Sequence, residues 1–227
     1  MDGLRSMGVP HGGVLFVHSS MKAIGPVEGG AECVLDVLSK FLSAGLLVLP
    51  SHSWDQIEKG NFVFDPKETR SCVGILSNLF MRRPGVFRSL HPTHSVAALG
   101  IGAESFVSGE EWTDTPCSRE GCYGKLYDMG AQVLFLGCSL KRNTLLHGVE
   151  EWNSIPGRIT ETTALFRIRM PASPSLSSSS MRRRVSCLAA TSRSCMAARI
   201  PPETRRSDLK QVLARRAEEL TKIRIRP

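Results

Sequence analysis

Three short apolar runs, each ending in polar residues, constrain the fold of this 227-residue chain most strongly. GGVLFVHSS, LLVLPSHSW and QVLFLGCSL each have the length and the β-branched and aromatic content of a buried strand. Between the first two lies AECVLDVLSKFLSA, whose apolar residues recur at helical spacing. This order predicts a β-α-β unit with parallel strands. We therefore expect an α/β fold, namely a layered α/β/α sandwich around a mixed, largely parallel sheet.

Size and composition are those of a globular protein. Hydrophobic residues make up 41% of the chain, which suffices for a buried core. No run approaches the roughly 20 apolar residues that a membrane span needs, and the N-terminal residues lack the apolar segment of a signal peptide. Seven cysteines without regular spacing fit a reducing compartment. The expected location is therefore the cytoplasm, with no membrane partner.

The net charge of +8 is concentrated at one end of the chain. Up to Pro171 there are 16 Lys and Arg residues against 17 Asp and Glu, whereas from Ala172 onward there are 13 against 4. Every Phe, Tyr and Trp also precedes residue 172. This break predicts one α/β domain over residues 1–171 and a Ser/Arg-rich basic tail over residues 172–227.

Three interpretations of the basic tail compete. A segment without aromatic residues cannot bury enough apolar surface to fold alone, so it can be a disordered extension that contacts nucleic acid electrostatically. It can also be a frame-disrupted sequence, and we favour this interpretation because the change in composition is abrupt. Aromatic residues that would stack on bases are absent, so no nucleic-acid partner is expected. A short helix over about residues 203–223 is compatible with either interpretation, since its leucines recur at helical spacing.

Histidines recur where the predicted strands end. His18 and His52 follow the first two apolar runs, and His147 lies a few residues after the third. In open α/β sheets, ligands bind beyond the carboxyl ends of the strands. The recurrence therefore favours a site at this edge, although any one of these histidines alone is typical of a structural or surface residue.

The segment NTLLHGVEEW gathers Thr144, His147, Glu150 and Glu151 just beyond the third predicted strand. On a helix, Thr144, His147 and Glu151 fall within an arc of about 60°, and Glu150 lies about 60° from His147 on the other side. Either carboxylate can therefore reach the imidazole. The alternative interpretation is a solvated helix face opposite the apolar residues of the same segment.

Four ordered motifs give the chain a family resemblance. VHSSMKAIGPVEGG, LPSHSW, FDPKETRSCVGILSNLFMRRPGVFRSLHPTHSVAALG and LGCSLKRNTLLHGVEEW, in this order and spacing, resemble the aminoglycoside 3-N-acetyltransferase family. The resemblance extends from about Gly8 to Pro171. It implies a layered α/β fold distinct from the GNAT acetyltransferases. It also implies acetyl-CoA as cosubstrate and a small-molecule amine as acceptor, namely the 3-amino group of a 2-deoxystreptamine aminoglycoside.

The resemblance also assigns roles around the third strand. His147 matches the histidine of the family's T-x-x-H-x-x-E motif, which acts as the general base, and an amine needs such a base because it is an ammonium at neutral pH. Glu150 matches the motif's carboxylate and would orient the ring, with Glu151 ranked second. Thr144 would donate a hydrogen bond to the oxyanion.

Cofactor and substrate contacts are expected from the remaining motifs. The Gly29 and Gly30 turn before a helix offers N–H groups for phosphate, with Lys22 as a nearby cation. The resemblance adds Ser19, Ser20 and Ser95 as parts of a pantetheine tunnel, and the substrate-binding residues Asp65, His52 and His91. The serines can instead satisfy backbone groups in turns, and Asp65 can belong to an ordinary Asx-Pro turn.

Two alternative functions remain open. His91 and His94, three residues apart, could serve a metal-dependent hydrolase, but Pro92 breaks the helix that such a pair normally occupies, so no metal is expected. The chain also departs from the family pattern after RIRMP, which makes an inactive truncated member the second candidate. The sequence leaves open which amine is acetylated and which oligomeric state is formed.

Overall fold

The computed structural model of the chain describes residues 1–170 and 180–188. These residues belong to one compact unit, Met1–Ala190. The helix predicted near residues 203–223 and most of the predicted basic tail lie outside the described residues. Within the described part of the chain, the helices are too short or too polar to span a lipid bilayer.

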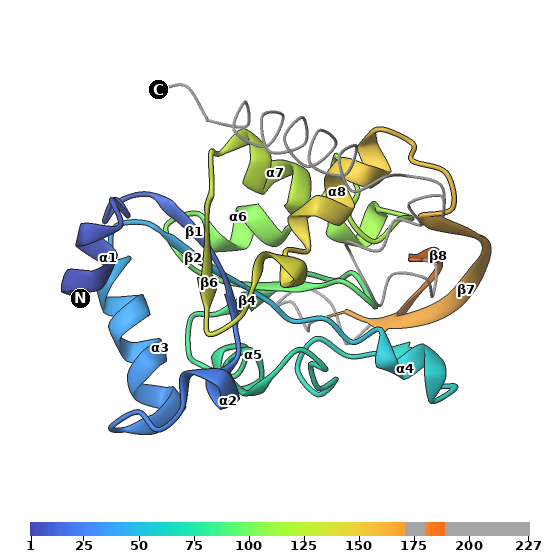
Figure 1. Cartoon of the computed structure of the whole chain (residues 1–227). Helices are drawn as coiled ribbons and strands as arrows, with labels where there is room; N and C mark the ends of the chain where they lie inside the picture. The colour runs from blue at the N-terminus through green and yellow to red at the C-terminus, as the bar shows by residue number, and fades with distance from the viewer. Residues whose placement is uncertain (171–179, 189–227) are drawn as a thin grey trace, which may run out of the picture. The chain divides into compact units, whose positions relative to one another are not determined.

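Helices and strands alternate along most of the unit (Figure 1). The strands are β1 (Val14–Ser19), β2 (Leu46–Pro50), β3 (Val63–Phe64), β4 (Phe87–Arg88), β5 (Val96–Gly100), β6 (Gln132–Leu136), β7 (Ile159–Arg169) and β8 (Ser180–Leu188). The helices are α1 (Asp2–Ser6), α2 (Met21–Ile24), α3 (Gly30–Phe41), α4 (Asp55–Glu58), α5 (Ile75–Phe80), α6 (Ala103–Val107), α7 (Cys122–Asp128) and α8 (Leu145–Trp152), with 3-10 turns η1 (Glu110–Trp112) and η2 (Leu140–Arg142).

The central sheet has the strand order β4-β5-β2-β1-β6. β1 is parallel to both β2 and β6, which confirms the predicted β-α-β unit and the mixed sheet. β5 runs antiparallel to β2 and β4, so parallel and antiparallel pairs are equal in number in this sheet, which is less parallel than we expected. The difference arises because VFRSLHPTHSVAALG forms the β4-β5 hairpin, whose connection is too short for a parallel crossover.

Alternate side chains of the central strands enter two separate cores, as the twofold period of a strand requires. Leu15 and Val17 of β1 pack with α3 and α5, whereas Phe16 packs with α6 and α7. Figure 1 shows these two helical layers on opposite sides of the sheet. The predicted α/β/α layering is therefore confirmed.

A second sheet has the order β3-β7-β8. Its inward side chains, Phe64, Phe166, Ile168 and Val185, are almost fully buried in a third core. β8 lies within the stretch that we predicted to be a basic tail, yet it pairs with β7 in antiparallel register. Because Val185 and Met181 of β8 pack into this core, this part of the predicted tail is part of the fold.

Arg88 of β4 joins four segments of the unit. Its guanidinium donates hydrogen bonds to Ser51 O at 2.7 Å, Ser95 Oγ at 3.1 Å and the carbonyl oxygens of Pro66 and Thr69. Its charged carbon also lies 4.9 Å from the ring centroid of Phe64. Burial lowers the pKa of Arg88 to about 10, against the opposing effect of the Asp65 charge, so it stays charged at neutral pH. This cation is therefore stabilised by carbonyl and hydroxyl dipoles in direct contact and by the charge of Asp65 at longer range.

We predict that Arg88→Met destabilises the unit by roughly 3 kcal/mol or more, because several buried carbonyl and hydroxyl acceptors lose their donor. The methionine removes every donor and leaves buried acceptors unsatisfied, at about 1–3 kcal/mol for each. Urea unfolding measures the change, with the exposed Arg5→Met as the matched control. A loss within about 1 kcal/mol of the control would contradict this account of Arg88.

Candidate functional site

The candidate site lies where β1, β2 and β6 end. These strands are parallel, so their carboxyl ends share one edge of the central sheet. Gly137, the first residue after β6, has φ +70°, and a Cβ there would lie 2.7 Å from the carbonyl oxygen of Ser20. Only glycine allows this close approach, which brings the segment leading to α8 against the chain that follows β1.

His147 and Glu150 of α8 form a hydrogen-bonded pair that a third residue completes. His147 Nδ1 lies 3.1 Å from Glu150 Oε2. Arg158 donates to the same oxygen through Nε at 2.9 Å and also through Nη2. The three side chains are 14%, 24% and 16% exposed, so the group is partly shielded from water but accessible.

The Glu150 carboxyl group stays ionised in this arrangement. Burial acts to raise its pKa, but the hydrogen bonds from His147 and Arg158 and the charge of Arg158 outweigh that effect and hold the pKa below its usual value. An ionised acceptor favours the His147 tautomer that carries its proton on Nδ1 and its lone pair on Nε2. That tautomer is the one a general base requires at Nε2.

Glu151 points to a different partner. Its carboxylate accepts hydrogen bonds from the Thr115 hydroxyl and from the backbone N–H of Cys117 at 3.0 Å. Burial raises its pKa against the lowering effect of these bonds. Of the two carboxylates that the sequence left open, Glu150 is the one in contact with His147, whereas Glu151 anchors the loop before α7.

Thr144 is the residue directly before α8, and it is buried. Its carbonyl oxygen accepts a hydrogen bond from the backbone N–H of His147 at 2.9 Å, which makes the first turn of the helix. This backbone bond fixes the two residues relative to each other. The role of its hydroxyl toward an oxyanion stays a prediction.

Buried histidines lie around His147. The rings of His52 and His94 are 4.8 Å apart, and His52 Nε2 lies 2.7 Å from the Tyr123 hydroxyl oxygen. Burial lowers the pKa of His18 to about 4 and that of His52 and His94 well below the usual value, and the charge of His147 lowers all of them further. The histidines predicted at the strand ends therefore interact with one another, and the buried rings of His18, His52 and His94 are neutral at neutral pH.

His91 and Ser95 are fully buried. His91 Nδ1 accepts the backbone N–H groups of Thr93 and His94, at 3.2 and 3.0 Å, in the turn between β4 and β5. Ser95 donates to Ser51 O and accepts from Arg88. Both side chains thus serve the backbone, and their predicted contacts with substrate and pantetheine would require this turn to open.

The residues predicted to hold the cofactor lie on the chain between β1 and α3. Ser19 and Ser20 are half-buried at the end of β1, and Lys22 is exposed in α2. Gly29 and Gly30 adopt positive φ values of 70° and 64° directly at the start of α3. The first N–H groups of that helix have no intrahelical acceptor, as at any helix N-terminus.

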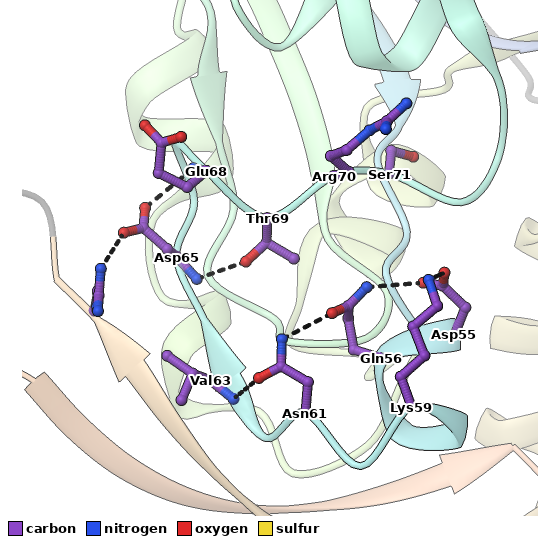
Figure 2. Close-up of a pocket in the computed structure, with 11 residues that line it drawn as sticks. Asp55, Gln56, Lys59, Asn61, Val63, Asp65, Glu68, Thr69, Arg70 and Ser71 are labelled. Atoms are coloured by element: carbon purple, nitrogen blue, oxygen red, sulfur yellow. Dashed lines mark hydrogen bonds and ion pairs between the residues drawn. The ribbon is translucent and has the colours of Figure 1, made fainter.

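Asp65 lies in the wall of an open pocket of about 560 Å³. Figure 2 shows its residues, which come from α4, β3, the following loop and Arg169 of β7. Asp65 accepts the backbone N–H groups of Lys67 and Glu68, and Arg169 Nη1 lies 3.3 Å from its second oxygen. Burial acts to raise the pKa of Asp65, but these bonds lower it overall. The pocket also contains the ion pair of Asp55 and Lys59.

The described residues contain no group of three or more His, Cys, Asp or Glu side chains that could hold a metal ion. Arg158, Tyr123 and Arg88 were not predicted as site or supporting residues. Arg88 lies within a quoted motif, but no local pattern marks its hydrogen bonds, and Tyr123 lies outside the motifs. Arg158 follows a Pro-Gly turn. The chain turns back toward α8 at this turn, and that direction depends on tertiary structure rather than on the local sequence.

This fold and geometry define a class of layered α/β proteins in which a His-Glu pair follows β6, the edge strand of the central sheet. The aminoglycoside 3-N-acetyltransferase family model matches residues 16–199 of the chain. The chain belongs to this family. Aminoglycoside N(3)-acetyltransferase III of Acinetobacter baumannii is 31% identical over 174 residues, covering 69% of this chain and 60% of the relative. The chain therefore spans 60% of the length of such curated relatives.

Solved structures share the fold. A histidine-to-alanine mutant of aminoglycoside acetyltransferase AAC(3)-IVa, in complex with a gentamicin, has a TM-score of 0.65 at 30% identity and covers 82% of this chain and 66% of its own. AAC-IIIb in a binary complex with CoASH has a TM-score of 0.68 at 23% identity, covering 82% of this chain and 73% of its own, and at that identity supports the fold alone.

The buried histidines make the fold sensitive to acid. Their pKa values are lower in the folded chain than the usual 6.5, to about 4 for His18 and about 3 for His91, so the unfolded chain binds more protons. The neutral, buried histidines therefore contribute fully to the free energy of unfolding above pH 6.5. This contribution is lost as the pH falls toward their pKa values in the folded chain. Each contributes a slope of up to about 1.4 kcal/mol per pH unit within that window.

Urea unfolding between pH 7.5 and 5.5, above the range where most carboxylates titrate, should show stability falling with pH. His91→Asn keeps an acceptor for the turn and removes one titrating ring, so its slope should be shallower than that of the parent chain. Equal slopes in the two proteins would show that His91 gains its proton equally easily in the folded and unfolded states.

Proposed function

We propose that this chain transfers an acetyl group from acetyl-CoA to an amine, namely the 3-amino group of a 2-deoxystreptamine aminoglycoside. The observation that carries the proposal is the hydrogen bond of 3.1 Å between His147 Nδ1 and Glu150 Oε2. Membership of the acetyltransferase family supports the reaction class. The cytoplasm, where coenzyme A thioesters are available, is the inferred location, and no nucleic-acid partner is part of the proposal.

His147 acts as the general base in this proposal. An alkyl ammonium with a pKa of about 10.4 cannot attack a carbonyl carbon until it loses a proton. Nε2 of His147 takes that proton, and the freed lone pair of the amine nitrogen then forms the bond to the acetyl carbon. The carbon–sulfur bond breaks, and the second proton of the nitrogen passes to the departing coenzyme A thiolate. Glu150 stabilises the imidazolium that results, as the acid does in hydrolase triads. Thr144, the residue before α8, is proposed as the oxyanion donor.

Acetyl-CoA supplies the acetyl group as an activated thioester. Its polyanionic end suits the first turn of α3, where N–H groups that follow the Gly29 and Gly30 turn lie at the positive end of the helix dipole. The Gly30 N–H itself bonds to Val27 O at 2.9 Å, and Lys22 of α2 is proposed as the cation. Ser19 and Ser20 are half-buried and offer hydroxyl groups to the polar arm of the cofactor. Ser95 is assigned only a supporting role because it is fully buried.

The acceptor is proposed to contact the pocket that contains Asp65. A solved AAC(3)-IVa mutant binds a gentamicin, and another structure of that protein contains apramycin. An aminoglycoside carries several ammonium groups, which carboxylates recognise by charge and hydrogen bonding. Asp65 is ionised and offers acceptor oxygens, whereas His52 and His91 are buried and do not line this pocket, so they are assigned only a supporting role.

A second candidate function is that of a family member without transfer activity. The specific observation that favours it is the change in composition from residue 172 onward, where the sequence becomes rich in Ser and Arg and departs from the family pattern. This candidate predicts a folded α/β unit in which His147 and Glu150 keep their contact but no acetyl group is transferred.

We expect His147→Gln to lower acetyl transfer by about 10²- to 10⁴-fold, the usual cost of losing a general base. Release of the coenzyme A thiol in the presence of gentamicin measures the rate. His11→Gln is the matched control, because His11 is an exposed histidine whose Nδ1 bonds to the carbonyl oxygen of Phe41. Turnover above a tenth of the parent rate in His147→Gln would remove His147 from the role, and no turnover in the parent chain would favour the second candidate.

Glu150→Gln and Glu151→Gln form a matched pair of isosteric changes. Glu150→Gln should lower kcat/KM by at least about tenfold, since the ring of His147 loses its anionic acceptor. Glu151→Gln should instead lower stability by about 1 kcal/mol, because Thr115 and Cys117 lose a charged acceptor, with a smaller effect on kcat/KM. Steady-state kinetics and urea unfolding on both variants separate the roles, and the reverse order of kinetic effects would contradict the assignment of Glu150.

A further inference from the structure

Arg158 reaches α8 from outside the family motif. α8 ends at Trp152, and the backbone N–H groups of Ser154 and Ile155 bond back to the carbonyl oxygens of Glu151 and Glu150. Ser154 is the only non-glycine with a positive φ among the described residues, at 51°, and Gly157 has φ +72°. These two positions turn the chain around the end of the helix, so that Arg158 lies beside the carboxylate of Glu150 before β7 begins.

One carboxylate oxygen then gathers three N–H donors. Glu150 Oε2 lies 3.1 Å from His147 Nδ1 and 2.9 Å from Arg158 Nε, and it also accepts from Arg158 Nη2. Arg158 Nη2 is itself 3.4 Å from His147 Nδ1. A guanidinium only donates hydrogen bonds, so Nδ1 could accept from Arg158 only by giving up its own proton.

Glu150 and Arg158 therefore act on His147 in opposite directions. The carboxylate favours a proton on Nδ1 and also favours the charged imidazolium. The guanidinium opposes the imidazolium, because two like charges in contact repel each other. When Glu150 and Arg158 are both present, Nδ1 of His147 stays protonated and donates to the nearer group, the Glu150 carboxylate. The opposite charges of Glu150 and Arg158 largely cancel in their effect on the charge of the His147 ring.

Within residues 1–170 and 180–188, three histidines and one further carboxylate also interact with His147. His18 of β1, His52 after β2 and His94 before β5 interact with it electrostatically, and burial keeps all of them neutral at neutral pH. Glu151 also interacts with His147, but its carboxylate is bonded to the Thr115 and Cys117 loop. Among the residues that the structure describes, Arg158 is the cation that contacts both Glu150 and His147.

We propose that Arg158 is a positioning residue that holds Glu150 against His147 and keeps the His147 ring uncharged at neutral pH, ready to accept a proton at Nε2. The inference rests on the proposed function of His147 as general base. It assigns to Arg158 the work of setting the pH range in which that base is available. A purely structural ion pair would contribute to stability without moving the titration of the ring.

The test follows the His147 ring by NMR in histidine-labelled protein, with the signal assigned by its absence in His147→Gln. Arg158→Met and Arg158→Gln remove the charge, and the midpoint of the His147 titration should rise by about 1–3 pH units in each. Arg158→Lys keeps the charge, so its midpoint should stay near that of the parent chain. Arg119→Met, which breaks the exposed ion pair with Asp128, is the matched control and should leave the midpoint unchanged.

Kinetics supply the second readout. The acid limb of the kcat/KM profile should move to higher pH in Arg158→Met, so that turnover lost at pH 7 is recovered at alkaline pH. An unchanged His147 midpoint in both neutral variants, or an equal rise in Arg158→Lys, would overturn the inference. Absence of acetyl transfer by the parent chain, with the midpoint still shifting, would instead contradict the proposed function.

Discussion

The arrangement of this unit depends most on the hydrogen bonds that the guanidinium of Arg88 donates. It connects the end of β2, the start of β5 and the loop that carries Asp65, using carbonyl and hydroxyl oxygens as acceptors. A buried cation without a carboxylate partner is stable only when such dipoles replace its hydration. The same segments carry His52 and His94, so the network that satisfies Arg88 also fixes the buried rings beneath the candidate site.

The site combines buried neutral histidines with one partly exposed charged group. His18, His52 and His94 lose their charge through burial, whereas His147 lies at the surface edge with Glu150 and Arg158. A base that must take up a proton at neutral pH requires this contrast, because neighbouring imidazolium ions would disfavour another positive charge. The fold thus separates histidines that support the site from the one proposed to act.

Local patterns in the sequence predicted what local physics determines. The apolar runs predicted β1, β2 and β6, and the helical spacing predicted α3, because buried strands and amphipathic helices have characteristic periods. Helical geometry left Glu150 and Glu151 open as partners of His147, and the choice depends on Thr115 and Cys117, which are distant in sequence. Arg158 and β8 were missed for the same reason: the turn after α8 and the pairing with β7 are tertiary features.

The most direct test of the account is to detect the product. The chain is incubated with acetyl-CoA that carries deuterium in its acetyl group and with gentamicin or apramycin, and mass spectrometry with tandem fragmentation locates the label. The account predicts a labelled N-acetyl group on the 3-amino nitrogen, formed by the parent chain and not by His147→Gln. Label that remains on coenzyme A in the presence of folded protein, or equal labelling by His147→Gln, would contradict it.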